Sequence, residues 1–145
     1  MFNLKTIFFA AVLIIGGITA ANSQISQGSV LKVNIPNSFV LNEKTFTAGK
    51  YTIERTPSTI DSPSLLILRD TKGNGIVFDT IATEVDTRAN STQLVFDNVN
   101  GTYFLSQIWV KGSTSSNDIP MSRSQREMIA NSPVHKVVVT TNTGF

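Results

Sequence analysis

The sequence predicts an all-β protein: an antiparallel β-sandwich or a small flattened barrel of about eight strands, with one short helix in the C-terminal half. Three observations predict this. Apolar and polar residues alternate in short runs rich in β-branched and aromatic side chains. Turn residues separate these runs at intervals of roughly 8–15 residues. No stretch changes composition enough to mark a second domain, so we expect one domain over residues 24–145.

The N-terminal residues have the layout of a secretory signal peptide. Lys5 gives a positive start, and the run from Thr6 to Ala20 is uncharged and mostly apolar. Cleavage after Ala21 would make residues 1–21 the signal peptide, and cleavage after Ser23 fits the small residues equally well. An uncleaved anchor is the alternative, but the apolar run of about 15 residues is shorter than the roughly 20 of a spanning helix. We expect an exported protein, periplasmic or secreted, with no stable membrane span after cleavage.

The composition excludes several classes of function. The chain has no cysteine, which excludes a lipid-anchored lipoprotein and a disulfide scaffold. Without Lys5, 11 of the 12 Lys and Arg remain against 10 Asp and Glu, and the basic residues are dispersed. Nucleic acid is therefore not an expected partner. We expect no cofactor either.

Five runs in the N-terminal half are expected strands. In the first of them Leu31, Val33 and Ile35 share one face, and Pro36 ends the run. The fourth is nearly continuous in apolar residues, which indicates a central strand. It should form a hairpin with the fifth run across a turn-rich loop. The expected strands are 29–35, 38–41, 50–56, 64–70 and 76–85.

The C-terminal half contains the clearest hairpin signal. Asn100-Gly101 suits a two-residue turn in which both residues have positive φ, so it should join Gln93–Asn98 to Thr102–Val110. A polar loop follows, and the last expected strand is Val134–Thr140.

The single credible helix begins after Ser122. Ser122 can cap it, and Gln125 completes a capping-box pattern three residues later. A narrow apolar stripe follows at helical spacing, and the helix should end at Asn131 and Pro133. The stripe consists of Met121, Gln125, Met128 and Ile129.

The stretch TFTAGKYTIE, Thr45–Glu54, is either a binding loop or a corner through which the chain enters a strand. Tyr51 and Ile53 alternate as inward anchors would, and Phe46 would cover the end of the core. Gly49 supplies a turn that other residues resist. We interpret the stretch as a structural corner. Gly101 begins a similar Gly-x-Tyr-x-aliphatic segment, which indicates repeated use of one local solution.

Catalytic patterns are weak. His135 is the only histidine and lies in a valine-rich run, so a Ser-His-carboxylate triad has little support. Ser29 and Lys32 match Ser-x-x-Lys, but on a strand they would point to opposite faces. Glu84 and Asp86 would share a strand face about 7 Å apart, a spacing found in inverting glycosidases. Such a pair is also common on solvated strands, so no catalytic residue is assigned.

Metal binding is also weakly supported. The run DTKGNG begins at Asp70 and is similar to a calcium loop in its first, fifth and sixth positions. Lys72 occupies the third ligand position and Ile81 the twelfth, where a bidentate Glu is needed. We expect a turn and no metal site.

Aromatic residues favour binding over catalysis. Trp109 and Tyr103 are the candidate ligand-binding residues, because exposed aromatic faces stack on sugar rings. Strict alternation puts Trp109, Tyr103 and Leu105 on one face of the strand. Both faces are rather apolar, so a central strand covered on both sides is the competing explanation.

Segments between Val30 and Glu127 carry a resemblance. They are VNIPNSFVLNEKTFTAGKYTIE, LLILRD, QLVFDNVNGTYFLSQIWVKG and MSRSQRE. They resemble a group of small exported bacterial proteins of unknown function with an Ala-Gly-x-Tyr corner. The chain departs from that pattern at Asn37, where the group tends to have Phe, and at Thr47, where it tends to have Pro. The resemblance implies export and a β-rich fold, and no reaction. The corner alone is also similar to one in transthyretin-like sandwich modules.

These patterns together favour a non-enzymatic exported β-domain, a binding or structural module of the cell envelope or exterior. The expected partner is a protein or a carbohydrate. Two alternatives stay open: a small barrel or sandwich that holds an apolar ligand or carbohydrate, and a hydrolase that uses carboxylates alone. A partly exposed Trp109 in a concave site would favour the first alternative, and Glu84 and Asp86 lining one cleft would favour the second.

Overall fold

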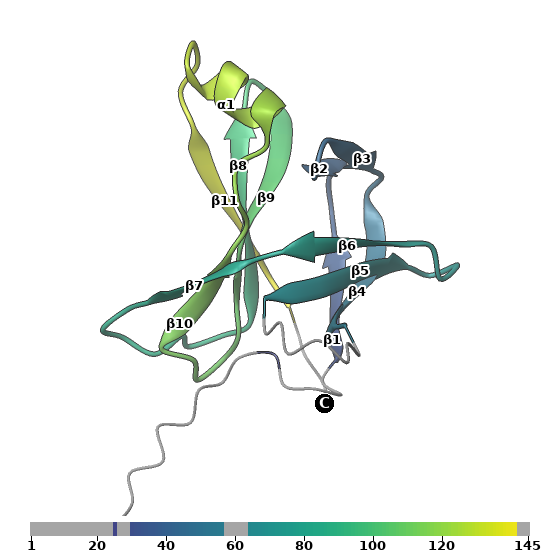
Figure 1. The fold of residues 1–145 in the computed structure, drawn as a ribbon, viewed down its shortest axis with the longest axis vertical. Helices are drawn as coiled ribbons and strands as arrows, with labels where there is room; N and C mark the ends of the chain where they lie inside the picture. The colour runs from purple at the N-terminus through teal and green to yellow at the C-terminus, as the bar shows by residue number, and fades with distance from the viewer. Residues whose placement is uncertain (1–24, 26–29, 57–63, 142–145) are drawn as a thin grey trace, which may run out of the picture.

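The computed structural model describes residue 25 and residues 30–56 and 64–141, so the expected signal peptide lies outside the described residues. The described residues form eleven strands and one helix (Figure 1). The first six strands are β1 (Val30–Ile35), β2 (Phe39–Leu41), β3 (Lys44–Phe46), β4 (Gly49–Arg55), β5 (Leu65–Asp70) and β6 (Gly75–Asp79). The rest are β7 (Ile81–Glu84), β8 (Gln93–Val99), β9 (Thr102–Trp109), β10 (Ser115–Asp118), helix α1 (Arg123–Ile129) and β11 (His135–Thr140).

The strands lie in two separate sheets, so the predicted sandwich is confirmed and the sheets do not close into one barrel. The first sheet has the order β1-β4-β5-β6, and all its pairs are antiparallel. The second has the order β11-β8-β9-β10-β7. Strand β2 joins the second sheet by pairing in parallel with β9, and β3 forms a hairpin with β2.

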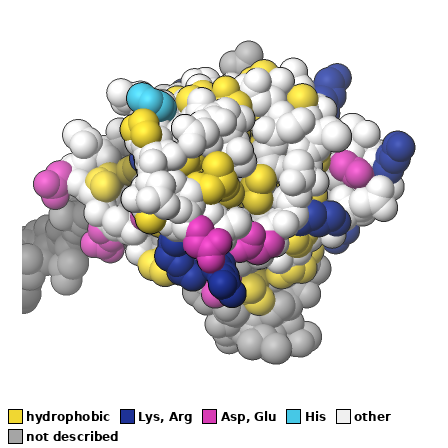
Figure 2. Space-filling view, turned by 90° about the horizontal axis from the view of Figure 1, so that it is seen from above, with side chains coloured by type: hydrophobic (Ala, Val, Ile, Leu, Met, Phe, Trp, Pro, Cys, Tyr) yellow, Lys and Arg dark blue, Asp and Glu magenta, His cyan; other side chains and the backbone are white. Residues whose placement is uncertain are grey.

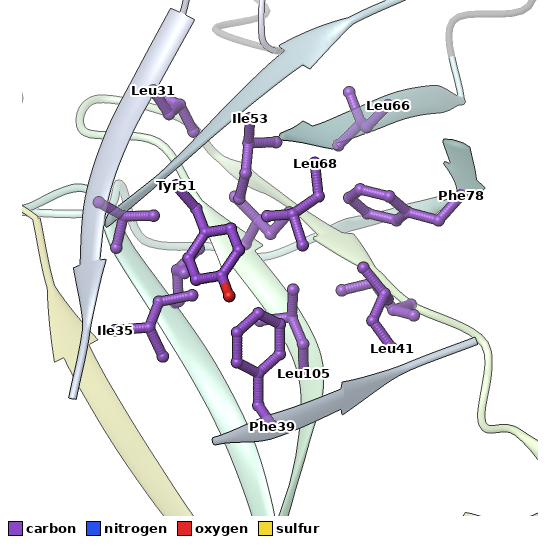
Figure 3. Close-up of a cluster of buried hydrophobic side chains, with 14 of the residues drawn as sticks. Leu31, Ile35, Phe39, Leu41, Tyr51, Ile53, Leu66, Leu68, Phe78 and Leu105 are labelled. Carbon is purple, nitrogen blue, oxygen red and sulfur yellow. The ribbon is translucent and has the colours of Figure 1, made fainter. Parts of the chain in front are cut away.

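The inner faces of the two sheets meet in one apolar core (Figure 3). Alternation explains it: in β1 the odd-numbered Leu31, Val33 and Ile35 are buried, whereas Lys32 and Asn34 are exposed. Each fully buried aliphatic or aromatic side chain stabilises the fold by roughly 1.5–3 kcal/mol. The labelled side chains of Figure 3 come from both sheets and point toward one another: Leu31, Ile35, Phe39, Leu41, Tyr51, Ile53, Leu66, Leu68, Phe78 and Leu105.

The sequence predicted one strand over residues 76–85. The structure has two strands there, and they belong to different sheets. β6 pairs with β5 in the first sheet, and β7 pairs with β10 in the second. Thr80 lies between them and is buried; its backbone N–H and its hydroxyl both donate to Ser64 O, at 3.0 Å each. Alternation cannot show such a crossing, because both halves are extended and rich in β-branched residues.

The geometry of the stretch Thr45–Glu54 supports its interpretation as a corner. Gly49 opens β4 with φ of +156°, a conformation that side chains disfavour. The Tyr51 hydroxyl donates to Thr47 O at 2.6 Å. The ring of Phe39 stacks on Phe46 with centroids 5.3 Å apart and meets the edge of Tyr51 at 5.4 Å.

Helix α1 has the predicted cap, but its buried contact is polar. Ser122 Oγ accepts from the backbone N–H of Gln125 at 3.2 Å. The Gln125 side chain does not close a capping box; it donates to Asp97 instead, and it is the buried residue of the helix. Met121 is 48% exposed, so it does not extend a buried stripe. With seven residues, this helix, the only one in the described residues, is too short to cross a membrane.

Candidate functional site

The site candidates on β9 depend on a bulge. Opposite β8, Val95 pairs with Gln107 and Phe96 pairs with Leu105, so Ser106 is the additional residue. The side-chain alternation therefore shifts by one position at Ser106. As a result Leu105 and Ile108 both enter the core, although alternation alone would put them on opposite faces.

The bulge separates Trp109 from Tyr103, which strict alternation put together. Tyr103 is two residues before Leu105 and packs against the core at the end of the strand near Asn98. Trp109 follows the core residue Ile108, so it lies on the outer face of the second sheet, opposite Gln93. The two aromatic residues therefore do not form one site, and the expectation of a shared face is wrong.

Trp109 lines a shallow hollow of about 450 Å³ on this outer face. The side chain is half-buried, and its indole N–H points to Gln107 Oε1 at 3.4 Å. The surrounding residues come from β8 and from the connection between β7 and β8. They are Val85, Thr87, Arg88, Ala89, Asn90 and Gln93.

Backbone hydrogen bonds hold the connection that forms the wall of the hollow. Val85 N donates to Thr114 O at 2.8 Å, and Ala89 N donates to Ser113 O at 2.9 Å. Gly112 N donates back to Ala89 O at 2.8 Å. The two loops therefore brace each other, and the exposed side chains of Arg88 and Asn90 stand on a fixed backbone at the rim.

The other end of the same outer face is closed. Asp97 is 1% exposed, and Gln125 Nε2 of α1 donates to its Oδ2 at 2.9 Å. Lys136 lies directly opposite Asp97 on β11 and forms an ion pair with it. Sequence reasoning missed this cluster. Its only signal is an acidic residue directly after an apolar run of three residues, and its partners are distant in sequence.

The proposed carboxylate pair does not have the assumed geometry. Glu84 is the last residue of β7, and Asp86 lies beyond it in a bend, so they do not share a strand face. Both are exposed, and neither lines the hollow at Trp109. His135, the only histidine of the chain, is exposed at the start of β11 (Figure 2, cyan). Ser29 lies outside the described residues.

The calcium-like run forms the β5–β6 turn. Asp70 Oδ1 accepts from the backbone N–H groups of Lys72 and Asn74, both at 2.9 Å, and Asp70 Oδ2 accepts from Asn74 Nδ2 at 3.1 Å. The Asn74 side chain is the main reason why the pKa of Asp70 is lowered. The carboxylate is therefore occupied within the turn. The described part of the chain brings no three His, Asp or Glu side chains close enough to hold a metal ion.

No protein-family model matches the chain, and no curated protein and no solved structure is significantly similar to it. The resemblance to small exported bacterial proteins therefore stays a prediction.

Proposed function

We propose that the protein is an exported, non-catalytic binding module that holds a neutral carbohydrate in the hollow at Trp109. The half-exposed indole of Trp109, in a hollow that is also lined by polar side chains, is the observation that carries the proposal. An aromatic face of this kind packs against the C–H groups of a sugar ring without requiring charge on the sugar. The expected signal peptide supports export.

The residues around Trp109 suit a polyhydroxylated ligand. Asn90 and Gln93 offer amide groups that both donate and accept, and Thr87 offers a hydroxyl. The volume of about 450 Å³ lies within the usual range for small-ligand sites. The hollow is open at the surface, which favours a segment of a glycan over an enclosed small molecule.

The same surroundings favour binding over reaction. Arg88 is the one charged residue among those that line the described hollow, so no acid–base pair faces the ligand. General acid–base hydrolysis of a glycosidic bond needs two carboxyl groups on either side of it.

A calorimetric titration with neutral hexasaccharides tests the proposal. Cellohexaose, xylohexaose and maltohexaose are suitable probes, and we expect saturable binding of at least one. Trp109→Ala should abolish this binding, whereas Tyr103→Phe, on the other face of β9, should leave it unchanged. Circular dichroism would show that both variants are folded. Equal binding by Trp109→Ala and the unmodified protein would refute the proposal, and so would the failure of a broad glycan panel to bind.

A further inference from the structure

A second hollow, of about 480 Å³, crosses the outer face of the first sheet. It lies on β1 and β4 and reaches the ends of β5 and β11. The inward-facing residues of β1 and β4 fill the core, so alternation turns Lys32, Asn34, Lys50 and Thr52 outward. Two of those four side chains are cationic, so this part of the face carries positive charge.

The two lysines form a diagonal pair. Lys32 lies opposite Thr52 and Asn34 lies opposite Lys50, which puts the lysines on neighbouring strands roughly 7 Å apart at their bases. Like charges at this distance repel each other, and an anion between them would relieve the repulsion.

Neither lysine has an ion-pair partner among the described residues. Arg69 on the same face does have such a partner, because its Nε lies 2.9 Å from Glu54 Oε1. Asp70 is the one acidic residue among the described residues that line the hollow, and its carboxylate oxygens accept hydrogen bonds within the β5–β6 turn. Lys32 and Lys50 are both exposed, so their ammonium groups are accessible to a ligand.

The sheet limits which anion can bind here. The backbone N–H groups of β4 are used in the ladders with β1 and β5, so they do not form a phosphate-binding nest. An anion must be held by long, solvated lysine side chains, and each such pair contributes little in water. Appreciable affinity therefore requires a ligand with repeated negative charges, so that both lysines are paired at once. The ligand should also carry hydroxyl groups that can bond with Asn34 and Thr52.

We propose that this groove binds an acidic polysaccharide. Its carboxylate or sulfate groups pair with Lys32 and Lys50, and its hydroxyl groups bond with Asn34, Thr52 and the exposed Thr140. Nucleic acid fits less well, because the one aromatic residue lining the groove, Tyr51, is buried with its ring among the core residues. This site is separate from the hollow at Trp109, and the proposal does not depend on the function assigned there.

A calorimetric titration of the chain, prepared without its expected signal peptide, with polygalacturonate tests the proposal. We expect binding that weakens as NaCl is added, because the contacts are ionic. The double variant Lys32→Gln/Lys50→Gln should bind about tenfold more weakly or not at all. The matched control is Lys44→Gln/Lys111→Gln, which removes the same charge from two other exposed lysines and should bind like the unmodified protein. Thermal unfolding would establish that both double variants are folded.

The outcomes separate this proposal from others. Equal weakening in both double variants would show a non-specific effect of net charge and overturn it, as would a lack of binding to polygalacturonate. The same titrations should be made with phosphatidylglycerol vesicles, single-stranded DNA and inorganic phosphate. If one of these binds more tightly than polygalacturonate, and binding depends on Lys32 and Lys50, that ligand would replace the acidic polysaccharide in the proposal. Trp109→Ala should retain polygalacturonate binding, so this site and the one at Trp109 can fail independently.

Discussion

The outer face of the β8–β9 hairpin has a closed end and an open end. At the closed end, Gln125 of α1 and Lys136 of β11 both contact the buried carboxylate of Asp97. At the open end, Trp109 is half-exposed above a hollow bordered by a loop. Both ends belong to the same two strands, but these strands present a buried carboxylate at one end and a half-exposed indole at the other. The face is closed where distant segments supply matched polar partners, and open where none is provided.

The largest expected effect is at the closed end, for Asp97→Ala. The change leaves the buried amide of Gln125 without its acceptor, which should cost about 2 kcal/mol in the free energy of unfolding. The ion pair contributes less, because the Lys136 side chain is 57% exposed. Asp97→Asn keeps an acceptor for Gln125 and should cost less. Denaturant unfolding would measure both, with Asp86→Ala as the exposed control. A loss no greater than that of the control would show that the closed end is not held by this carboxylate.

A smaller effect is expected for Ser122→Ala, which removes the cap of α1. The backbone N–H of Gln125 loses its acceptor, and we expect a loss of about 1 kcal/mol. Removing the exposed hydroxyl of Ser38 by Ser38→Ala should change stability little. Thermal melting would measure the two variants. Similar melting temperatures would mean that the cap does not hold α1 over Asp97.

A pH effect should follow from Glu43, which joins the β2–β3 turn to α1. Its carboxylate accepts from the Ser124 hydroxyl and from Ser124 N, and these bonds lower its pKa. A pKa lowered in the folded state means that the stabilisation is present above the unfolded pKa and is lost as pH falls through the folded pKa. As pH is lowered from the unfolded pKa of Glu43 through its folded pKa, the melting temperature should fall less steeply for Glu43→Gln than for the unmodified protein. Glu127→Gln is the control on the helix surface, and it should keep the steeper fall.

The smallest effect on stability is expected at the open end. Gln93→Ala should change the free energy of unfolding by at most about 0.5 kcal/mol, because the half-buried side chain faces the hollow. The same variant should weaken binding of the hexasaccharide identified at Trp109. Denaturant unfolding and calorimetry would measure the two quantities. A large loss of stability would mean that Gln93 belongs to the packing and not to the rim of a site.

Local patterns predicted the sandwich well, because alternation and turn chemistry act over a few residues. Asn100-Gly101 forms the predicted tight turn between β8 and β9, with φ of 51° and 84°. The β2–β3 turn also has positive φ, at Asn42 and Glu43, but it contains no glycine that would mark such a turn in the sequence. Glu43 takes this unfavoured conformation where its carboxylate reaches α1.

The site could be predicted only in part, since its geometry depends on irregular features. Trp109 was singled out from the sequence, but the bulge at Ser106, which turns it away from the core, has no sequence signature. The partners of Asp97 also could not be predicted, because the register of β11 on β8 and the position of α1 are set by long-range packing. Such contacts join residues that no local pattern relates.

Trp109 is the only tryptophan of the chain, so its fluorescence reports directly on the proposed site. The decisive measurement is a titration of the protein with the neutral hexasaccharide that binds it, following Trp109 emission and its quenching by acrylamide. We predict a saturable change in emission and protection of the indole from acrylamide, at the same concentrations at which calorimetry shows binding. Calorimetric binding with unchanged emission and unchanged quenching would place the ligand elsewhere and contradict the assignment of the hollow at Trp109.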